Sequence, residues 1–159
     1  MKPCFTRPAT EADALSVARR LTKEDREEVL ANCGMSPELV LPGYVSSGRE
    51  VYASGLLETC RPEILFGVDP IYGNPEGGVV WMLTTDAVYD HPVESVWNIK
   101  QLFEALHDRY PLLTNFIDAR NTRHHKLLKW LGFRPFMRVE KFGAHSLPFI
   151  EFASYRPCA

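Results

Sequence analysis

Residues 121–133, NTRHHKLLKWLGF, carry side chains that could transfer a proton or bind an anion. Helical spacing places His124 on one face with Leu127 and Leu128. The opposite face carries three basic residues: Arg123, Lys126 and Lys129. An imidazole titrates near neutral pH, so His124 is a candidate general base, and the basic face should attract anions. A histidine on an apolar helix face is more often a hydrogen-bonded core residue, and a basic face is more often simply solvated. Both interpretations stay open.

Several other kinds of site are not indicated. His124 and His125 are adjacent and point in different directions on a helix, so we expect no metal site. The cysteines form no Cys-x-x-Cys pair, which favours reduced, mostly buried thiols; they are Cys4, Cys33, Cys60 and Cys158. No Gly-x-Ser-x-Gly nucleophile pattern occurs. The net charge of −2 and the lack of a recognised motif argue against nucleic acid as a partner.

The composition indicates one soluble domain. With 159 residues and 45% hydrophobic side chains, the chain can bury a core that is stable unaided, and we expect residues 1–159 to form a single domain. No apolar stretch approaches the roughly 18 residues that span a bilayer. The first residues also lack the apolar centre of a signal peptide. We therefore expect a cytoplasmic protein without a membrane partner.

The first third of the chain predicts one short strand followed by helices. Residues 5–7 are expected to form the strand. Two Thr-x-x-Asp capping patterns, at residues 10–13 and 22–25, each predict a helix start, and Gly34 should end the second helix. A third helix follows, which Pro42 should limit to a turn or two.

The rest of the chain predicts strands around two helices. Residues 51–58, 64–68 and 79–85 alternate with turn residues and should form an antiparallel meander. Residues 96–110 have the spacing of a helix of about four turns, with these apolar positions: Trp97, Ile99, Leu102, Phe103 and Leu106. A strand at 112–119 precedes the helix of residues 121–133, and the segments 136–142 and 148–155 should form a closing antiparallel pair.

This order of elements, together with Asn121, Gly132 and Phe133, resembles the GNAT N-acetyltransferase superfamily. In that superfamily an Asn after the fifth strand opens a short helix that ends in Gly-Phe. The resemblance covers nearly the whole chain. It implies an α/β (α+β) fold, in which a mixed, mostly antiparallel central sheet is flanked by helices. The Trp-rich fourth strand, the Arg-Tyr-Pro that ends the long helix and the Asn-Thr-x-His segment further resemble a divergent group of tailed-bacteriophage proteins. That group includes acetyltransferase-like proteins and an internal virion protein.

The resemblance implies an acetyl-CoA site made by Met82, Leu83, Thr84, Ser95, Asn121, Arg123 and Lys126. The first three would hold the pantetheine arm through their backbone. The helix start at residues 92–95 and the two basic side chains would face the phosphates. Three side chains near the expected opening of the sheet are candidate general bases: Glu58, Asp86 and His124.

Two features depart from the superfamily pattern. Leu128 stands where active members commonly have a Tyr that protonates the departing thiolate, so Tyr89, Tyr110 or water would have to take that role. Residues 84–98 contain no glycine, whereas typical relatives carry a glycine-containing phosphate loop there. This stretch instead carries three acidic residues: Asp86, Asp90 and Glu94.

Two functions therefore remain open. The first is an acetyl-CoA-dependent N-acetyltransferase that acts on an amine of a host or phage protein, which the Asn121 segment favours. The second is a catalytically inactive GNAT-fold binding protein that serves virion assembly or host takeover, which Leu128 and the missing glycines favour. Either protein would act in the host cytoplasm or in association with the virion.

Overall fold

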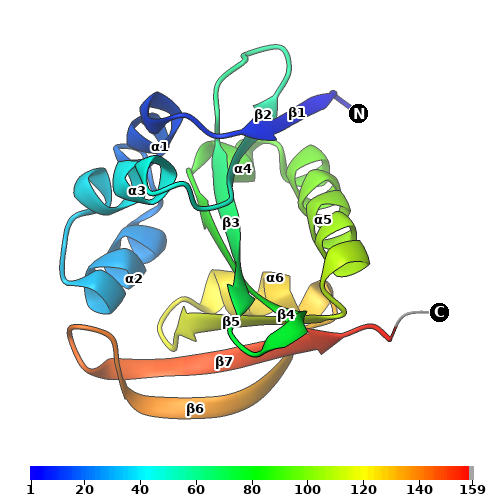
Figure 1. Ribbon diagram of the computed structural model, residues 1–159. Helices are drawn as coiled ribbons and strands as arrows, with labels where there is room; N and C mark the ends of the chain where they lie inside the picture. Colours follow the sequence, from blue (N-terminus) through cyan, green and yellow to red (C-terminus); the bar gives the residue numbers. More distant parts are fainter. Residues whose placement is uncertain (158–159) are drawn as a thin grey trace.

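A seven-stranded mixed sheet forms the centre of the computed structural model, which describes residues 1–157 (Figure 1). The strands are β1 (Cys4–Pro8), β2 (Val51–Leu56), β3 (Ile64–Ile71), β4 (Asn74–Thr84), β5 (Leu112–Asp118), β6 (Arg134–Phe142) and β7 (Leu147–Tyr155). They lie in the order β1-β2-β3-β4-β5-β7-β6. The β4–β5 pair is parallel and every other neighbouring pair is antiparallel. The predicted α+β architecture with a mostly antiparallel sheet is confirmed.

Helices cover both faces of this sheet. One face carries α1 (Glu11–Ala18), α2 (Lys23–Cys33) and α3 (Pro37–Ser46), and the other carries α5 (Pro92–Arg109) and α6 (Thr122–Trp130). The turn α4 (Ala87–Asp90) lies between β4 and α5. Each face has its own hydrophobic core, centred on Val17, Leu41 and Leu65 on the first face and on Phe103, Leu128 and Phe133 on the second. Within residues 1–157, no helix combines the length and the apolar character needed to cross a membrane.

The two Thr-x-x-Asp patterns begin α1 and α2 as predicted, but they differ in how the aspartate is used. Thr10 and Asp13 form a reciprocal capping box at α1. At α2, the Thr22 hydroxyl accepts a hydrogen bond from the backbone N–H of Asp25 at 3.2 Å. The Asp25 side chain does not return to the cap and instead bonds to Thr84 at the end of β4. The cap of α2 therefore leaves one carboxylate free for a tertiary role.

Two helix predictions were wrong. α3 continues through Pro42 to Ser46, because Leu41 is buried and Tyr44 packs against the same core; tertiary packing outweighs the backbone hydrogen bond that proline removes. α5 begins at Pro92, within the start predicted at residues 92–95, but Trp97 is half exposed rather than part of the buried apolar face.

The cysteines lie nearer the surface than predicted. Cys60 is exposed, and Cys4 and Cys33 are partly buried. Cys158 lies outside the described residues. The prediction of mostly buried thiols was therefore wrong for the three cysteines that the structure describes.

The orientation predicted for α6 is confirmed. Leu128 and Leu131 are buried, Leu127 packs at the edge of the same core, and Lys126 and Lys129 are exposed. Gly132 takes a left-handed conformation with φ of 93°, which few other residues adopt without strain. The chain can therefore turn there and bury Phe133 completely.

This orientation predicts unequal effects of truncating two residues of α6. Leu128→Ala should lower the free energy of unfolding by about 2–4 kcal/mol, because it removes buried methyl groups and leaves a cavity. Lys129→Ala should change it by about 0.5 kcal/mol or less. Urea unfolding midpoints, compared at equal slope, measure both values. A loss for Lys129→Ala as large as that for Leu128→Ala would show that α6 is rotated relative to this orientation.

Candidate functional site

The parallel strands β4 and β5 separate part-way along their length. Their pairing runs from Gly77 opposite Leu112 and ends at Val79 opposite Thr114. Both strands continue, β4 to Thr84 and β5 to Asp118. The last residues of the two strands therefore lie on either side of an opening in the sheet.

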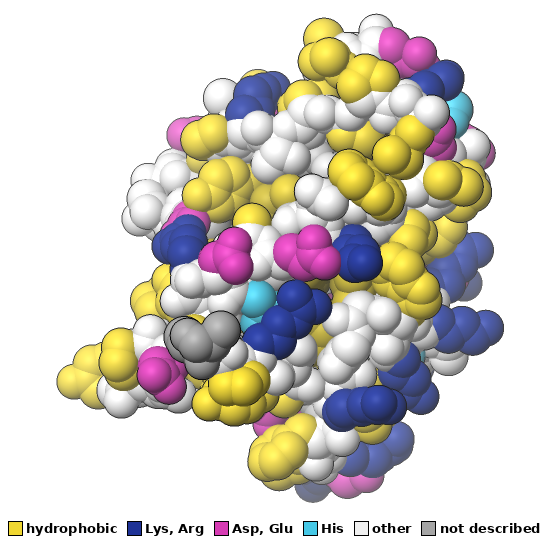
Figure 2. All heavy atoms as spheres, turned by 90° about the vertical axis from the view of Figure 1, so that its right-hand side faces the viewer, with side chains coloured by type: hydrophobic (Ala, Val, Ile, Leu, Met, Phe, Trp, Pro, Cys, Tyr) yellow, Lys and Arg dark blue, Asp and Glu magenta, His cyan; other side chains and the backbone are white. Residues whose placement is uncertain are grey.

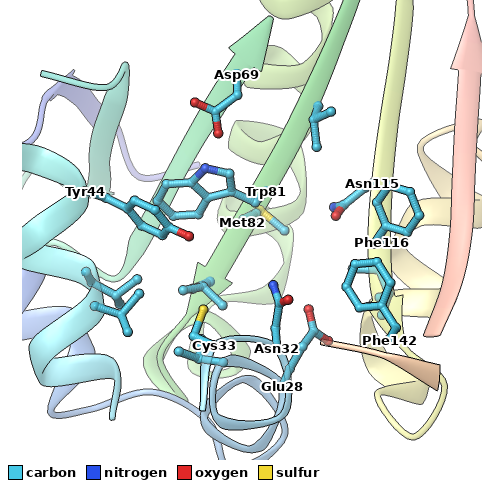
Figure 3. A pocket seen from close by; sticks show the side chains of 16 residues that line it. Glu28, Asn32, Cys33, Tyr44, Asp69, Trp81, Met82, Asn115, Phe116 and Phe142 are labelled. Atoms are coloured by element: carbon cyan, nitrogen blue, oxygen red, sulfur yellow. The ribbon is translucent and has the colours of Figure 1, made fainter. Parts of the chain in front are cut away.

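A cavity of about 220 Å³ reaches this opening on the face covered by α2 and α3 (Figure 3). Residues 81–83 of β4 and 115–117 of β5 form two of its walls. α2 and α3 contribute further lining residues, including Glu28, Cys33 and Tyr44. The lining is mostly apolar or aromatic with a few polar groups, which is the usual character of a small-molecule site.

A buried carboxylate of α2, Asp25, closes one end of the opening. One of its oxygens accepts hydrogen bonds from the backbone N–H of Thr84 at 2.7 Å and from the Thr84 hydroxyl at 3.0 Å. The other accepts a hydrogen bond from Nδ2 of Asn121 at 3.0 Å and lies 3.4 Å from Nε2 of His124. Asp25 thus joins the end of β4 to the start of α6.

A second carboxylate of α2, Glu28, lies beside Asp25 and lines the cavity. Its Oε2 accepts hydrogen bonds from Nδ2 of Asn121 at 3.0 Å and from the backbone N–H of Asp118 at 3.2 Å. Burial raises the pKa of Glu28 to about 8, and the negative charge of Asp25 adds to this effect. At neutral pH the Glu28 carboxyl group is therefore largely protonated. A perturbed carboxyl group in a cavity is a candidate for proton transfer.

Asn121 connects these groups to α6. Its side-chain oxygen caps the helix by accepting a hydrogen bond from the backbone N–H of His124 at 3.3 Å. Its side-chain nitrogen donates to both Asp25 and Glu28. The predicted place of Asn121 at the start of the helix is confirmed, while its role toward a cofactor stays a prediction.

Sequence reasoning missed both carboxylates. Asp25 was interpreted as a capping residue, which hid its contact with β4. A signal was nevertheless present, because Asp25, Glu28 and Val29 follow one another at helical spacing on one face. Val29 belongs to the core, so the two acids beside it had to be buried as well.

The three predicted cofactor residues of β4 differ in whether their backbone groups are free to bind a cofactor. Met82 and Leu83 line the cavity beyond the last paired residue of β4. Thr84 is already engaged: its N–H donates to Asp25, and its C=O accepts a hydrogen bond from the N–H of Thr22 at 3.0 Å. The start of α2 therefore occupies the strand edge at this position.

The region predicted to face the phosphates is filled in part by α4. Arg123 lies over the ring of Tyr89, 4.7 Å from its centroid. It also lies 3.8 Å from a carboxylate oxygen of Glu24 and 3.9 Å from one of Asp86. The backbone N–H of Ser95 donates to the C=O of His91, and Ser95 lines a separate cavity beside the end of β2, residues 59–64 and α4. Figure 2 shows Lys and Arg side chains gathered at the lower right of the face that carries α5.

The three candidate general bases are not brought together. His124 is buried beside Asp25. Asp86 is exposed and lies near Arg123. Glu58 follows β2 and pairs with Lys2 at 2.7 Å, toward the β1 edge of the sheet and away from the opening. The catalytic roles of all three stay predictions.

The two tyrosines considered as alternative acids also lie apart. Burial raises the pKa of Tyr89, and the nearby charge of Asp25 raises it further. The Tyr89 ring lies under Arg123 of α6, the helix that follows the end of β5. Tyr110 packs against Gly78, where β4 and β5 are still paired. Tyr89 is therefore the tyrosine nearer to the separated strand ends.

One family model matches part of the chain. Residues 65–137 match a family model described as "Bacteriophage T7, probable scaffold protein Gp13". This segment runs from β3 into β6 and includes the opening between β4 and β5. No curated protein matched the chain.

Solved structures resemble the chain over nearly its whole length. A GNAT-family acetyltransferase from Bacillus anthracis superimposes with a TM-score of 0.74 at 10% identity, covering 98% of this chain and 96% of that one. A ribosomal-protein-S5-alanine acetyltransferase from Vibrio fischeri gives 0.61 at 15% identity, with coverage of 98% and 94%. The Salmonella typhimurium protein yncA, named as an acetyltransferase and solved with its cofactor acetyl-CoA, gives 0.63 at 14% identity, with coverage of 96% and 93%. The chain therefore has the GNAT fold, and the predicted resemblance is confirmed at that level.

Proposed function

We propose that this chain is an N-acetyltransferase that uses acetyl-CoA to modify an amine of a host or phage protein. The observation that carries this proposal is the opening between β4 and β5, with a cavity that reaches it from the α2–α3 face. The fold shared with acetyltransferases, one of them solved with acetyl-CoA, supports the same assignment. When bound, acetyl-CoA would supply the acetyl group as a thioester.

The residues present fit this cofactor in part. The backbone of Met82 and Leu83 lies beyond the paired part of β4 and is suited to hold an extended arm. Lys126 is exposed and can add positive charge, whereas Arg123 is shared with Asp86 and Glu24. The chain's own residues would contribute mainly by holding the reacting groups in position, which can supply much of the rate enhancement of acyl transfer.

The proposed phosphate site predicts the effect of reversing charge on α6. The double variant Arg123→Glu/Lys126→Glu should bind acetyl-CoA at least about tenfold more weakly, because two cations near the phosphates become anions. Titration calorimetry measures the affinity. Lys129→Glu, a reversal of an exposed charge on the same helix, is the matched control and should have a much smaller effect. If the two variants lost equal affinity for acetyl-CoA, or if the double variant lost none, the phosphates would not bind at this edge of α6.

The enzyme assignment itself is tested by incubating the protein with acetyl-CoA and a mixture of lysine-containing peptides. Mass spectrometry should detect acetylated peptide and free coenzyme A in equal amounts. Failure to bind acetyl-CoA in calorimetry, together with no acetylated product, would reject the proposal.

A second function is favoured by a specific observation, the occupation of the Thr84 backbone by Thr22 and Asp25. A strand edge that is bonded to the chain's own α2 is less available to a cofactor. In this alternative the chain is a GNAT-fold binding protein without catalysis that serves virion assembly or host takeover, in the host cytoplasm or the virion. The partial match to a family described as a phage scaffold protein supports it. Absence of acetyl-CoA binding by a folded protein would favour this alternative.

A further inference from the structure

The charges of this chain are unevenly distributed. Residues 120–141 carry seven Lys or Arg side chains and one acidic side chain, although the whole chain has a net charge of −2. The remainder of the chain is therefore strongly acidic. Figure 2 shows Lys and Arg side chains gathered at the lower right, at the height of α6 and β6 in Figure 1. Hydrophobic side chains, with acidic ones among them, spread over the upper half of the same face.

The basic surface also exposes large apolar side chains. It is formed by the last turn of α6 and the start of β6, and we call it the basic patch: Lys129, Trp130, Arg134, Phe136 and Met137. Trp130 is 57% exposed and Phe136 is 74% exposed. β6 is the outermost strand of the sheet, and residues 134–138 are all exposed. Nothing within residues 1–157 therefore covers this part of the strand.

The acidic surface is built from segments that touch one another near the start of α5. The backbone N–H of Lys2 donates to a carboxylate oxygen of Glu94 at 3.4 Å, and Nζ of Lys2 pairs with Glu58 at 2.7 Å. Asp90, at the end of α4, is exposed as well. Three acidic groups therefore surround one lysine. Half or more of each large apolar side chain in these segments is exposed: Met1, Leu57, Val93 and Trp97. We call these acidic and apolar residues together the acidic patch.

We infer that two copies of the chain associate in an antiparallel, two-fold arrangement, with the acidic patch of each copy against the basic patch of the other. Opposite charges favour this pairing, whereas each patch repels the same patch of another copy. The two-fold axis makes each contact occur twice. Exposed aromatic and methionine side chains, which both patches carry, are typical of the buried centre of an interface. The association needs neither acetyl-CoA nor catalysis, so it is independent of the proposed function.

The first test is the mass of the wild-type chain in solution. Sedimentation equilibrium in about 0.05 M sodium chloride should show the average mass rising with protein concentration and levelling off at about twice the monomer mass. Raising the salt to about 0.5 M should move dissociation to higher protein concentrations, because salt screens exposed charges. A wild-type chain that stays monomeric at every concentration, or that forms species larger than a dimer, would overturn the inference.

Charge reversal tests which surfaces meet. Lys129→Glu/Arg134→Glu makes the basic patch acidic, and Asp90→Lys/Glu94→Lys makes the acidic patch basic. Each double variant alone should associate at least about tenfold more weakly than the wild type, because like charges then face one another. An equimolar mixture of the two variants should form a 1:1 heterodimer, because each reversed patch again meets an opposite charge.

The matched control is Arg19→Glu/Lys23→Glu, which reverses two exposed cations at the end of α1 and the start of α2, on the other face of the sheet. This variant should dimerise like the wild type. Trp130→Ala should weaken the dimer without lowering the melting temperature of the monomer, because more than half of the side chain is exposed. Thermal melting verifies that every variant is folded. A mixture of the two charge-reversed variants that stays monomeric would contradict the inference, as would wild-type dimerisation by either of them alone.

Discussion

Replacing Asp25 with alanine should lower the free energy of unfolding by about 3–5 kcal/mol, the range for breaking a buried charged network. The carboxylate accepts hydrogen bonds from the backbone and hydroxyl of Thr84 and from the side chain of Asn121. Its removal leaves these donors buried without an acceptor, and each orphaned group adds its own desolvation cost. Urea unfolding at pH 7 measures the loss.

The control for this prediction is Glu27→Ala on the same helix. The Glu27 side chain is partly exposed and pairs with Lys23 at 3.7 Å, so its removal should change stability by about 0.5 kcal/mol or less. Asp25→Asn keeps the shape of the side chain and should fall between the two. Equal losses for Asp25→Ala and Glu27→Ala would mean that the bonds to Thr84 do not hold α2 on β4.

The same carboxylate helps to separate the two candidate functions. Asp25 occupies the Thr84 N–H, a group at the strand edge where the proposed cofactor arm would lie. If acetyl-CoA binds the wild-type chain, α2 has to release this edge or the arm has to bond to Met82 and Leu83 alone. If it does not bind, the contact between Asp25 and Thr84 explains how a GNAT fold can lack the cofactor.

Local patterns in the sequence predicted much of the fold. The capping threonines, the helical spacing of Leu128 and Leu131 and the stop at Gly132 all act within a few residues of one another. Their outcome therefore depends little on the rest of the chain. Pro42 shows the limit of such patterns, since the packing of Leu41 and Tyr44 on the core decided the length of α3.

The site was predicted less completely, because its key contacts join distant parts of the sequence. Asp25 and Thr84 are 59 residues apart, and Glu28 and Asn121 are 93 residues apart. No local pattern reports such pairs. Arg123 illustrates the same point. Helical spacing predicted that its charged side chain is exposed, but not its neighbours, Glu24 of α2 and Asp86 just before α4.

Glu28 should make the stability of the protein fall as the pH rises from about 5 to about 8. Its pKa is about 8 in the folded chain, against an ordinary value of 4.5. Between these values the folded state holds a proton that the unfolded state has released, so raising the pH favours unfolding. Each unit of separation corresponds to about 1.4 kcal/mol. Glu28 should therefore lower the free energy of unfolding by about 3–5 kcal/mol over this range. The upper value corresponds to the full difference between the two pKa values.

Glu28→Gln isolates this effect, because glutamine has a similar shape but does not titrate. Urea unfolding from pH 5 to 9 should show the variant gaining stability relative to the wild type as the pH rises, with the change centred between 5 and 8. The other ionisable groups are the same in both proteins, so the difference between the two curves cancels most of their contribution. For Glu27→Gln on the same helix, the free energy of unfolding should change with pH in the same way as that of the wild type. A constant difference between wild type and Glu28→Gln across this range would mean that Glu28 is already ionised in the folded chain. The cavity would then carry a negative charge at Glu28 throughout this pH range.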